Sequence, residues 1–256
     1  MPRYNKNFIT QVVLRADFVP GTVPLTQPLG EDLLAALEGF PVRSVMNRTK
    51  TEVQVQKTPQ GPVKNTSTRS FPEHNFLPAD KTRRVALCTD YVFLEERRYE
   101  DYASLKELFT DVTDALAVQH PGMKLRRLGM RYINEIKLPE PDAGPGLGAE
   151  FWEQYINPLL LGGLRFAAND GALARHMCST ELNYGIDRAT IRYGIFNQEY
   201  PKPNRHRNFI LDIDAYCQTE LLPAAVPGKL EDFHTAACSV FEAAVTNALR
   251  ARMGQS

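Results

Sequence analysis

The sequence lacks the signatures of several protein classes. Its longest apolar run, around residues 158–164, contains two glycines and is shorter than the roughly 18 residues that a membrane span needs. Its 30 basic and 30 acidic residues balance, which excludes a strongly basic nucleic-acid coat. The four cysteines are widely spaced without a CxxC pair, and the N-terminus has no signal-peptide pattern. We therefore expect a cytoplasmic protein with reduced cysteines and no membrane partner.

Local catalytic motifs are also missing. The sequence contains no P-loop, no GxGxxG motif after a strand, no GxSxG and no HExxH. Apart from the pair His176 and Cys178, no histidine lies within three residues of another histidine or of a cysteine. That pair has no second half at zinc-site spacing. We therefore expect no cofactor, and the sequence favours a protein that is not an enzyme without settling the question.

What the sequence does contain is a chain of 256 residues, 43% of them hydrophobic, which is enough for a substantial core and one to two domains. Its patterns predict strands at 8–19, 43–57, 84–94, 124–138 and 208–218, a hairpin at 177–196, and helices at 31–40, 99–118, 150–161 and 230–252. Pro158 should end or kink the third helix. The polar stretches 58–80 and 139–148 are predicted to be loops, the first a long loop or hairpin tip.

The order of these elements repeats. Strand, helix, antiparallel strands and a long helix occur twice, and residues 112–116 (VTDAL) match residues 245–249 (VTNAL). We predict an α+β fold with two internally duplicated units, 1–122 and 123–256, packed as one globular unit. Each antiparallel sheet would be covered by its long helix, because both have one apolar face to bury. Two unrelated α+β halves are the alternative. Duplicated halves would leave a groove along their pseudo-twofold seam.

The candidate binding residues lie on the strand at 124–138. Five basic residues and one acid occur between residues 124 and 137, which predicts a surface attractive to phosphates or an acidic partner. Alternation places Arg127, Gly129 and Arg131 on one face, whereas Met130 and Tyr132 lie on the other, packing face. Gly129 would let a ligand or backbone approach closely, or else mark a bulge. The predicted binding set is Lys124, Arg126, Arg127, Gly129, Arg131 and Asn134.

Asp212 and Asp214 are weak candidates for a metal site. They lie two residues apart on a predicted strand, so they share one face. Paired carboxylates can hold Mg²⁺ together with substrate phosphates. The alternative is a structural role, in which the carboxylates cap the strand or form ion pairs, for instance with Arg205 and Arg207. We expect the structural role, because no third metal ligand lies at a useful spacing.

The central part of the chain resembles an uncharacterised, sporadically distributed prokaryotic protein family of similar length. The resemblance rests on DYVFL at 90–94, on LGMRYINEI at 128–136, whose most specific part is RYIN at 131–134, and on LDID at 211–214. The N-terminus fits less well, because the family tends to have an acid where Gln11 stands. The family has no established activity, so the resemblance implies no catalytic residues. Its patchy distribution implies a mobile or accessory role, such as one in a defence cassette.

Three functions follow from these observations. The leading hypothesis is a non-enzymatic binding or protein-interaction protein, with a protein or a small anionic ligand as its partner. The second is an RNA- or DNA-binding subunit that uses the basic strands, although the zero net charge argues against it. The third is a metal-dependent hydrolase or nuclease that uses Asp212 and Asp214.

Overall fold

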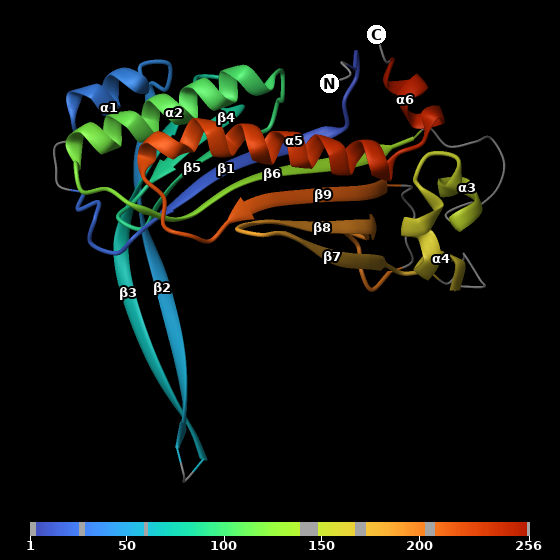
Figure 1. Cartoon of the computed structure of the whole chain (residues 1–256), viewed down its shortest axis with the longest axis horizontal. Helices are drawn as coiled ribbons and strands as arrows, with labels where there is room; N and C mark the ends of the chain where they lie inside the picture. The colour runs from blue at the N-terminus through green and yellow to red at the C-terminus, as the bar shows by residue number, and fades with distance from the viewer. Residues whose placement is uncertain are drawn as a thin grey trace.

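The computed structural model describes residues 4–25, 29–58, 61–138, 148–166, 173–202 and 208–254. Within them, nine strands form one antiparallel sheet in the order β2-β3-β4-β5-β1-β6-β9-β8-β7 (Figure 1). The strands are β1 (Ile9–Phe18), β2 (Val42–Thr58), β3 (Gly61–Leu77), β4 (Arg83–Leu87), β5 (Tyr91–Glu96), β6 (Leu125–Lys137), β7 (His176–Tyr184), β8 (Asp187–Ile195) and β9 (Asn208–Cys217). The predicted α+β class is therefore confirmed.

The helices are placed unevenly around this sheet. Helices α1 (Glu31–Ala36), α2 (Tyr102–Gln119) and α5 (Val226–Ala244) lie on one side of it (Figure 1). At one end of the sheet lie α3 (Ala149–Glu153), the 3-10 helix η1 (Pro158–Leu161), α4 (Gly162–Phe166) and α6 (Asn247–Met253). A second 3-10 helix, η3 (Pro223–Ala225), leads into α5. None of the helices in the described ranges is long and apolar enough to cross a membrane.

Alternation along the central strands builds the main core. On β6, Leu128, Met130 and Tyr132 are buried toward α2 and α5, as the sequence predicts. The apolar stripe of α2 that meets them repeats at three- and four-residue steps, which places it on one helix face. Its buried members are Leu105, Phe109, Val112 and Leu116, and those of α5 are Leu230, Phe233 and Ala237. The sheet therefore buries one face beneath the helices.

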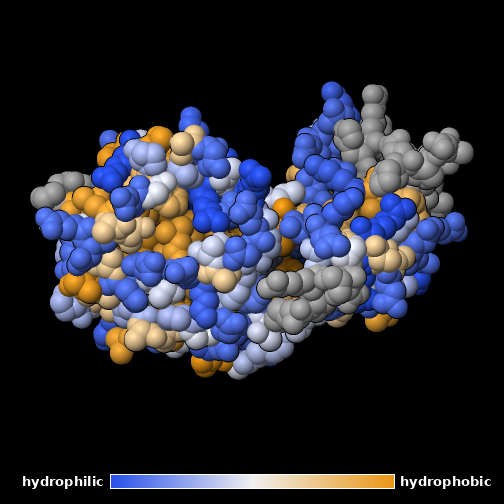
Figure 2. Space-filling view, turned by 90° about the horizontal axis from the view of Figure 1, so that it is seen from above, coloured by the Kyte–Doolittle hydropathy of each residue, from blue (hydrophilic) through white to orange (hydrophobic). Residues whose placement is uncertain are grey.

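The outer side of the helix layer is mixed in character. Seen from above, hydrophilic residues alternate with hydrophobic patches, which are largest over the part where α1 and α2 lie (Figure 2).

The four cysteines are free thiols, and Cys88 and Cys217 are buried. Buried free cysteines behave as small apolar side chains.

The polar stretch at 58–80 is mostly strand rather than loop, so that prediction is wrong. Residues 61–77 form β3, which pairs with β2 along all 17 residues. Only His74, Asn75 and Phe76 also pair with β4, so the rest of the hairpin extends away from the sheet as an arm (Figure 1). Both arm faces are solvated. The sequence therefore lacks the apolar alternation by which a half-buried strand is recognised.

Two further elements are divided where continuous ones were predicted. The strand expected at 84–94 is the hairpin β4–β5, which turns at Cys88, whose N–H bonds to Tyr91 O at 2.9 Å. The helix expected at 230–252 ends at Ala244, because Val245 is extended and bridges to Ile156. The segment at 150–161 breaks before Pro158, as expected. The loop predicted at 139–148 lies, except for its last residue, outside the described residues.

The two predicted repeats share one sheet instead of having a sheet each. Strand β1 from residues 1–122 pairs directly with β6 from residues 123–256. The local match between 112–116 and 245–249 does not have a structural counterpart, because the first lies inside α2 and the second at the break between α5 and α6. Helices α2 and α5 nevertheless lie side by side on the same face.

Candidate functional site

The candidate site lies on the sheet face turned away from α2 and α5. The predicted alternation of β6 is confirmed: Arg127, Gly129 and Arg131 lie on this face, opposite the buried Met130 and Tyr132. Register brings β1 and β9 alongside them. Arg15 of β1 and Tyr216 of β9 stand directly across from Gly129, and Asp214 stands across from Arg131.

A hollow of about 380 Å³ opens at the pairing of β1 with β6. Three neighbouring strands contribute its walls, which consist of Val13, Arg15, Asp17, Arg127, Gly129, Arg131 and Asp214. This set of residues is called the seam hollow below. Its wall holds three guanidinium groups and two carboxylates. The hollow therefore coincides with the predicted seam between residues 1–122 and 123–256.

Arg127 is the least satisfied of the three arginines. Its guanidinium lies over the Tyr216 ring, 5.0 Å from the ring centroid, and a Cβ on Gly129 would come within 3.1 Å of both of its Nη atoms. Nη2 donates to Asp214 at 3.3 Å, a long contact for an ion pair. Among the described residues, Nε and Nη1 donate to no acceptor, although the side chain is only 22% exposed. Gly129 thus leaves room for the Arg127 guanidinium, which keeps unused donors at the hollow.

The other two arginines have firm carboxylate partners. Arg131 donates two hydrogen bonds of 2.7 Å to the two carboxylate oxygens of Asp212, which is only 6% exposed. The Asp212 carboxylate raises the pKa of Arg131 above its usual value. Arg192 of β8 reaches the same carboxylate at 3.4 Å. Arg15 bonds to Asp17 at 2.8 Å. The prediction that an aspartate of the 212/214 pair forms an ion pair with a neighbouring strand is confirmed.

Of the two aspartates on β9, Asp214 has the weaker ion-pair contacts. Burial raises its pKa above the ordinary range, and the positive charges of Arg127 and Arg131 offset only part of this effect. Its contact to Arg127 is longer than the two contacts that Asp212 receives from Arg131. Protonation of Asp214 would remove one negative charge from a wall whose arginine and aspartate charges otherwise nearly cancel.

Three of the predicted binding residues are not at the seam hollow. Asn134 is buried on the helix side and donates to Leu211 O at 3.1 Å. Lys124 forms an exposed ion pair of 2.7 Å with Glu220. Arg126 donates to Phe18 O at 3.1 Å. The structure brings Arg127, Gly129 and Arg131 together, and it leaves these three apart.

Sequence reasoning missed the contribution of β1. Val13, Arg15 and Asp17 alternate with buried residues of that strand, so their outward orientation could have been predicted. Their position beside β6 depends on strand pairing far apart in the sequence. The same holds for two more arginine–aromatic contacts on this face, Arg15 over Tyr91 at 4.3 Å and Arg84 over Phe93 at 4.9 Å.

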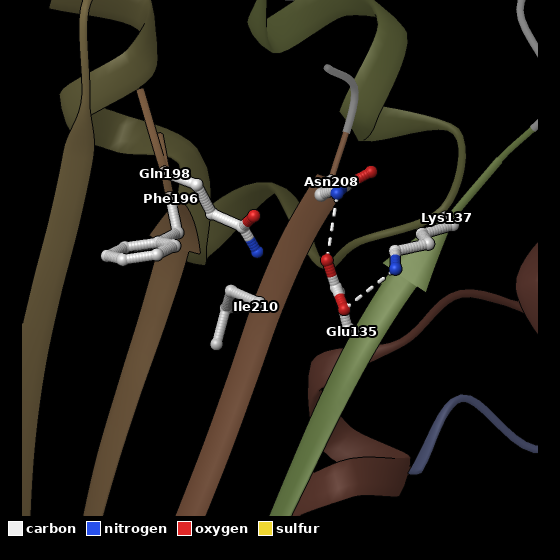
Figure 3. A pocket seen from close by; sticks show the side chains of 6 residues that line it. All are labelled: Glu135, Lys137, Phe196, Gln198, Asn208 and Ile210. Atoms are coloured by element: carbon white, nitrogen blue, oxygen red, sulfur yellow. Dashed lines mark hydrogen bonds and ion pairs between the residues drawn. The ribbon is translucent and has the colours of Figure 1, made fainter. Parts of the chain in front are cut away.

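A second hollow of about 300 Å³ lies on the same face toward the other end of β6 and β9. Glu135 stands at its centre and accepts from Asn208 at 2.8 Å and from Lys137 at 2.9 Å (Figure 3). Both carboxylate oxygens therefore have partners. Phe196, Gln198 and Ile210 complete the wall. This hollow offers no cation without a partner, so it is the weaker candidate.

The described side chains do not gather the ligands of a metal site. In the described part of the chain, no three His, Cys, Asp or Glu residues gather closely enough to hold a metal ion. Asp212 and Asp214 share a face as predicted, and arginines occupy the space beside them. Arg205 and Arg207, the alternative partners, lie outside the described residues.

Comparison with known proteins does not assign a function to this site. No protein-family model matches the chain, and no curated protein matches it significantly.

Proposed function

We propose that this protein is a non-enzymatic binding protein that holds an anionic group of its ligand or partner in the seam hollow. The observation that carries the proposal is the Arg127 guanidinium, which is fixed over Gly129 and Tyr216 while its Nε and Nη1 donate to no described acceptor. A part-buried arginine whose remaining donors are open to the hollow favours an anion, because charge-assisted hydrogen bonds to an anion are stronger than those to water. Arg15 and Arg131 flank it on the same wall.

The arrangement supports binding over metal-dependent hydrolysis. A Mg²⁺ site needs oxygen ligands turned toward one point. Here Asp212 is held by Arg131 and Arg192, and Asp214 faces Arg127. The two carboxylates therefore balance the charges of the arginines, and the arginines are left to contact a ligand.

The internal duplication belongs to this proposal. Strands β5, β4 and β3 follow β1 on one side of the seam, and β9, β8 and β7 follow β6 on the other. The long helices α2 and α5 come directly after β5 and closely after β9. This order supports two copies of one unit that meet at β1 and β6, with the ligand on their common boundary. Superposition of the two halves in an experimental structure tests it, and different strand directions or helix placements would contradict it.

Sulfate is a suitable probe for the proposed site because its charge does not change near neutral pH. Isothermal titration calorimetry with sodium sulfate, at constant ionic strength in sodium chloride, should show saturable binding. Arg127→Gln should weaken the binding about tenfold, the factor that corresponds to one charge-assisted hydrogen bond of about 1.4 kcal/mol. Lys124→Gln is the matched control, because it removes a positive charge from the residue just before β6, away from the hollow.

Two results would contradict the proposal. One is the absence of saturable sulfate binding by the unaltered protein, and the other is equal binding by the Arg127→Gln and unaltered proteins.

The accessory role in a mobile or defence gene cassette, which the sequence resemblance implies, is a separate part of the proposal. Its test is the gene neighbourhood, where association with unrelated housekeeping genes would argue against it.

A further inference from the structure

Most of the β2–β3 arm projects beyond the strand pairing that joins it to the sheet, and near its base Lys50 and Arg69 form ion pairs with Asp90. Beyond the three residues that pair with β4, about 13 residues of each strand extend from the sheet, which corresponds to roughly 40 Å at about 3.3 Å per residue. The arm points away from the helix layer (Figure 1). It lies outside the seam hollow, so it requires its own explanation.

The arm concentrates positive charge in a chain whose net charge is zero. The projecting residues, 46–73 with their turn, contain five basic residues, Arg48, Lys50, Lys57, Lys64 and Arg69, and two acids, Glu52 and Glu73. The net charge of this segment is therefore +3, and that of the remaining chain is −3. Lysines on edge strands commonly prevent edge-to-edge aggregation. That role needs only a few charged side chains, whereas the arm carries basic residues along both of its strands.

The two faces of the arm differ. One face carries Arg48, Lys50 and Arg69, whose side chains are 41%, 38% and 53% exposed. Near the base of the arm they approach Glu73 and Asp90, so acids neutralise only this part. The opposite face is exposed, with small uncharged side chains along its middle and Lys64 nearer the tip; the small residues are Thr49, Thr51, Val53, Thr66, Thr68 and Ser70.

We propose that the arm is a ribbon that binds double-stranded DNA. A two-stranded antiparallel ribbon fits the major groove of B-DNA, which is about 12 Å wide. Lysines and arginines along a ribbon neutralise phosphates on the groove walls, and this sequence-independent attraction suits the +3 charge of the arm. The small side chains allow the ribbon to approach the groove closely. The deep, narrow major groove of A-form RNA would not admit it.

Fluorescence anisotropy with a labelled duplex of about 25 base pairs, between about 50 and 200 mM salt, tests this inference. The full chain is compared with the triple variant Lys50→Gln, Lys64→Gln, Arg69→Gln. The matched control is Arg98→Gln, Lys106→Gln, Arg165→Gln, which removes three positive charges outside the arm. Circular dichroism melts verify folding, and Lys64→Gln alone alters one exposed arm residue in case the triple variant is unstable.

The unaltered chain should bind the duplex, with an affinity that falls steeply with salt. Each lost phosphate contact makes the slope of log K against log salt shallower by about 0.9, so Lys64→Gln should lose up to about 0.9. The arm triple should lose more than Lys64→Gln alone but less than three full contacts, because Asp90 already pairs with Lys50 and Arg69. The arm triple should bind more than about tenfold more weakly at 100 mM salt, and the control triple should bind nearly normally.

Three results would overturn the inference. They are absence of duplex binding at low salt, equal weakening in the arm and control triples, and tighter binding of an RNA duplex than of the DNA duplex. If sedimentation shows that the arm substitutions abolish self-association while DNA is not bound, the arm instead contacts a second copy of the chain.

Discussion

Gly129→Ala tests how tightly the seam hollow is built. A Cβ at position 129 would lie 3.1 Å from Nη1 and Nη2 of Arg127 and 3.1 Å from Cβ of Tyr216. Comfortable contacts are about 3.5–4.0 Å. The Arg127 guanidinium must therefore shift by a few tenths of an ångström and lose part of its contact with the Tyr216 ring, because Cβ of Tyr216 is held by its own strand.

The opposing contributions can be compared. Alanine in place of a strand glycine normally stabilises a fold by about 0.5–1 kcal/mol. Inserting a methyl group into a packed site costs about 1–3 kcal/mol, and the lost cation–π contact costs about 0.5–1 kcal/mol. Crowding outweighs the entropic gain, so we expect Gly129→Ala to destabilise the protein by about 1–2 kcal/mol.

Urea unfolding of a double-mutant cycle measures this effect. In an Arg127→Ala background the guanidinium is absent, so Gly129→Ala should cost about 1 kcal/mol less than in the unaltered protein. Stabilisation by Gly129→Ala in the unaltered protein would refute the crowding argument. An equal cost in both backgrounds would show that Tyr216 alone opposes the methyl group.

Further predictions concern pH, the partners of Asp212 and cooperativity. Burial lowers the pKa of the histidines at 74, 120, 176 and 234. As the pH falls, the unfolded chain therefore takes up protons before the folded chain does, and stability should fall below about pH 6.5. A urea midpoint that stays constant between pH 7.5 and 5.5 would contradict this. Asp212→Asn should lower the free energy of unfolding by about 1–2 kcal/mol, since it removes the negative charge opposite the part-exposed Arg131. Chemical denaturation measures this loss, and an unchanged stability would mean that water replaces the ion pair. Fluorescence of the buried Trp152 should change at the same urea concentration as the circular dichroism signal, because β1–β6 pairing joins both predicted repeats; separate transitions would indicate two independently folding units.

The strands and helices that could be predicted are those with one buried face and one solvent-exposed face. Strand β6 lies within one residue of the predicted 124–138 at each end, and its faces were assigned as observed, because Met130 and Tyr132 alternate with Arg127 and Arg131. Helix α2 was recognisable for the same reason, from its apolar stripe. In the arm, β2 was predicted at 43–57. Its partner β3 was missed, because water surrounds both faces of that strand and neither is apolar.

Local sequence patterns also could not predict where a helix is interrupted by a contact with a distant segment. Val245 continues the apolar pattern of α5, yet it is extended because it bridges to Ile156 in a remote segment. The candidate site divides in the same way. Arg127, Gly129 and Arg131 share a strand face and could be grouped from the sequence. Their neighbours Arg15 and Asp17 depend on the β1–β6 register, which no local pattern specifies.

The central claim is that an anion binds beside Arg127 in the seam hollow, and side-chain NMR tests it most directly. Arginine Nε–Hε and backbone amide resonances are recorded while sulfate is added at constant ionic strength. The proposal predicts that the largest changes occur at Arg127 Nε–Hε, whose donor has no described acceptor, and at the amide of Gly129. An unmoved Arg127 resonance, with the largest changes at Lys137 and Asn208 in the second hollow or on α2 and α5, would contradict it.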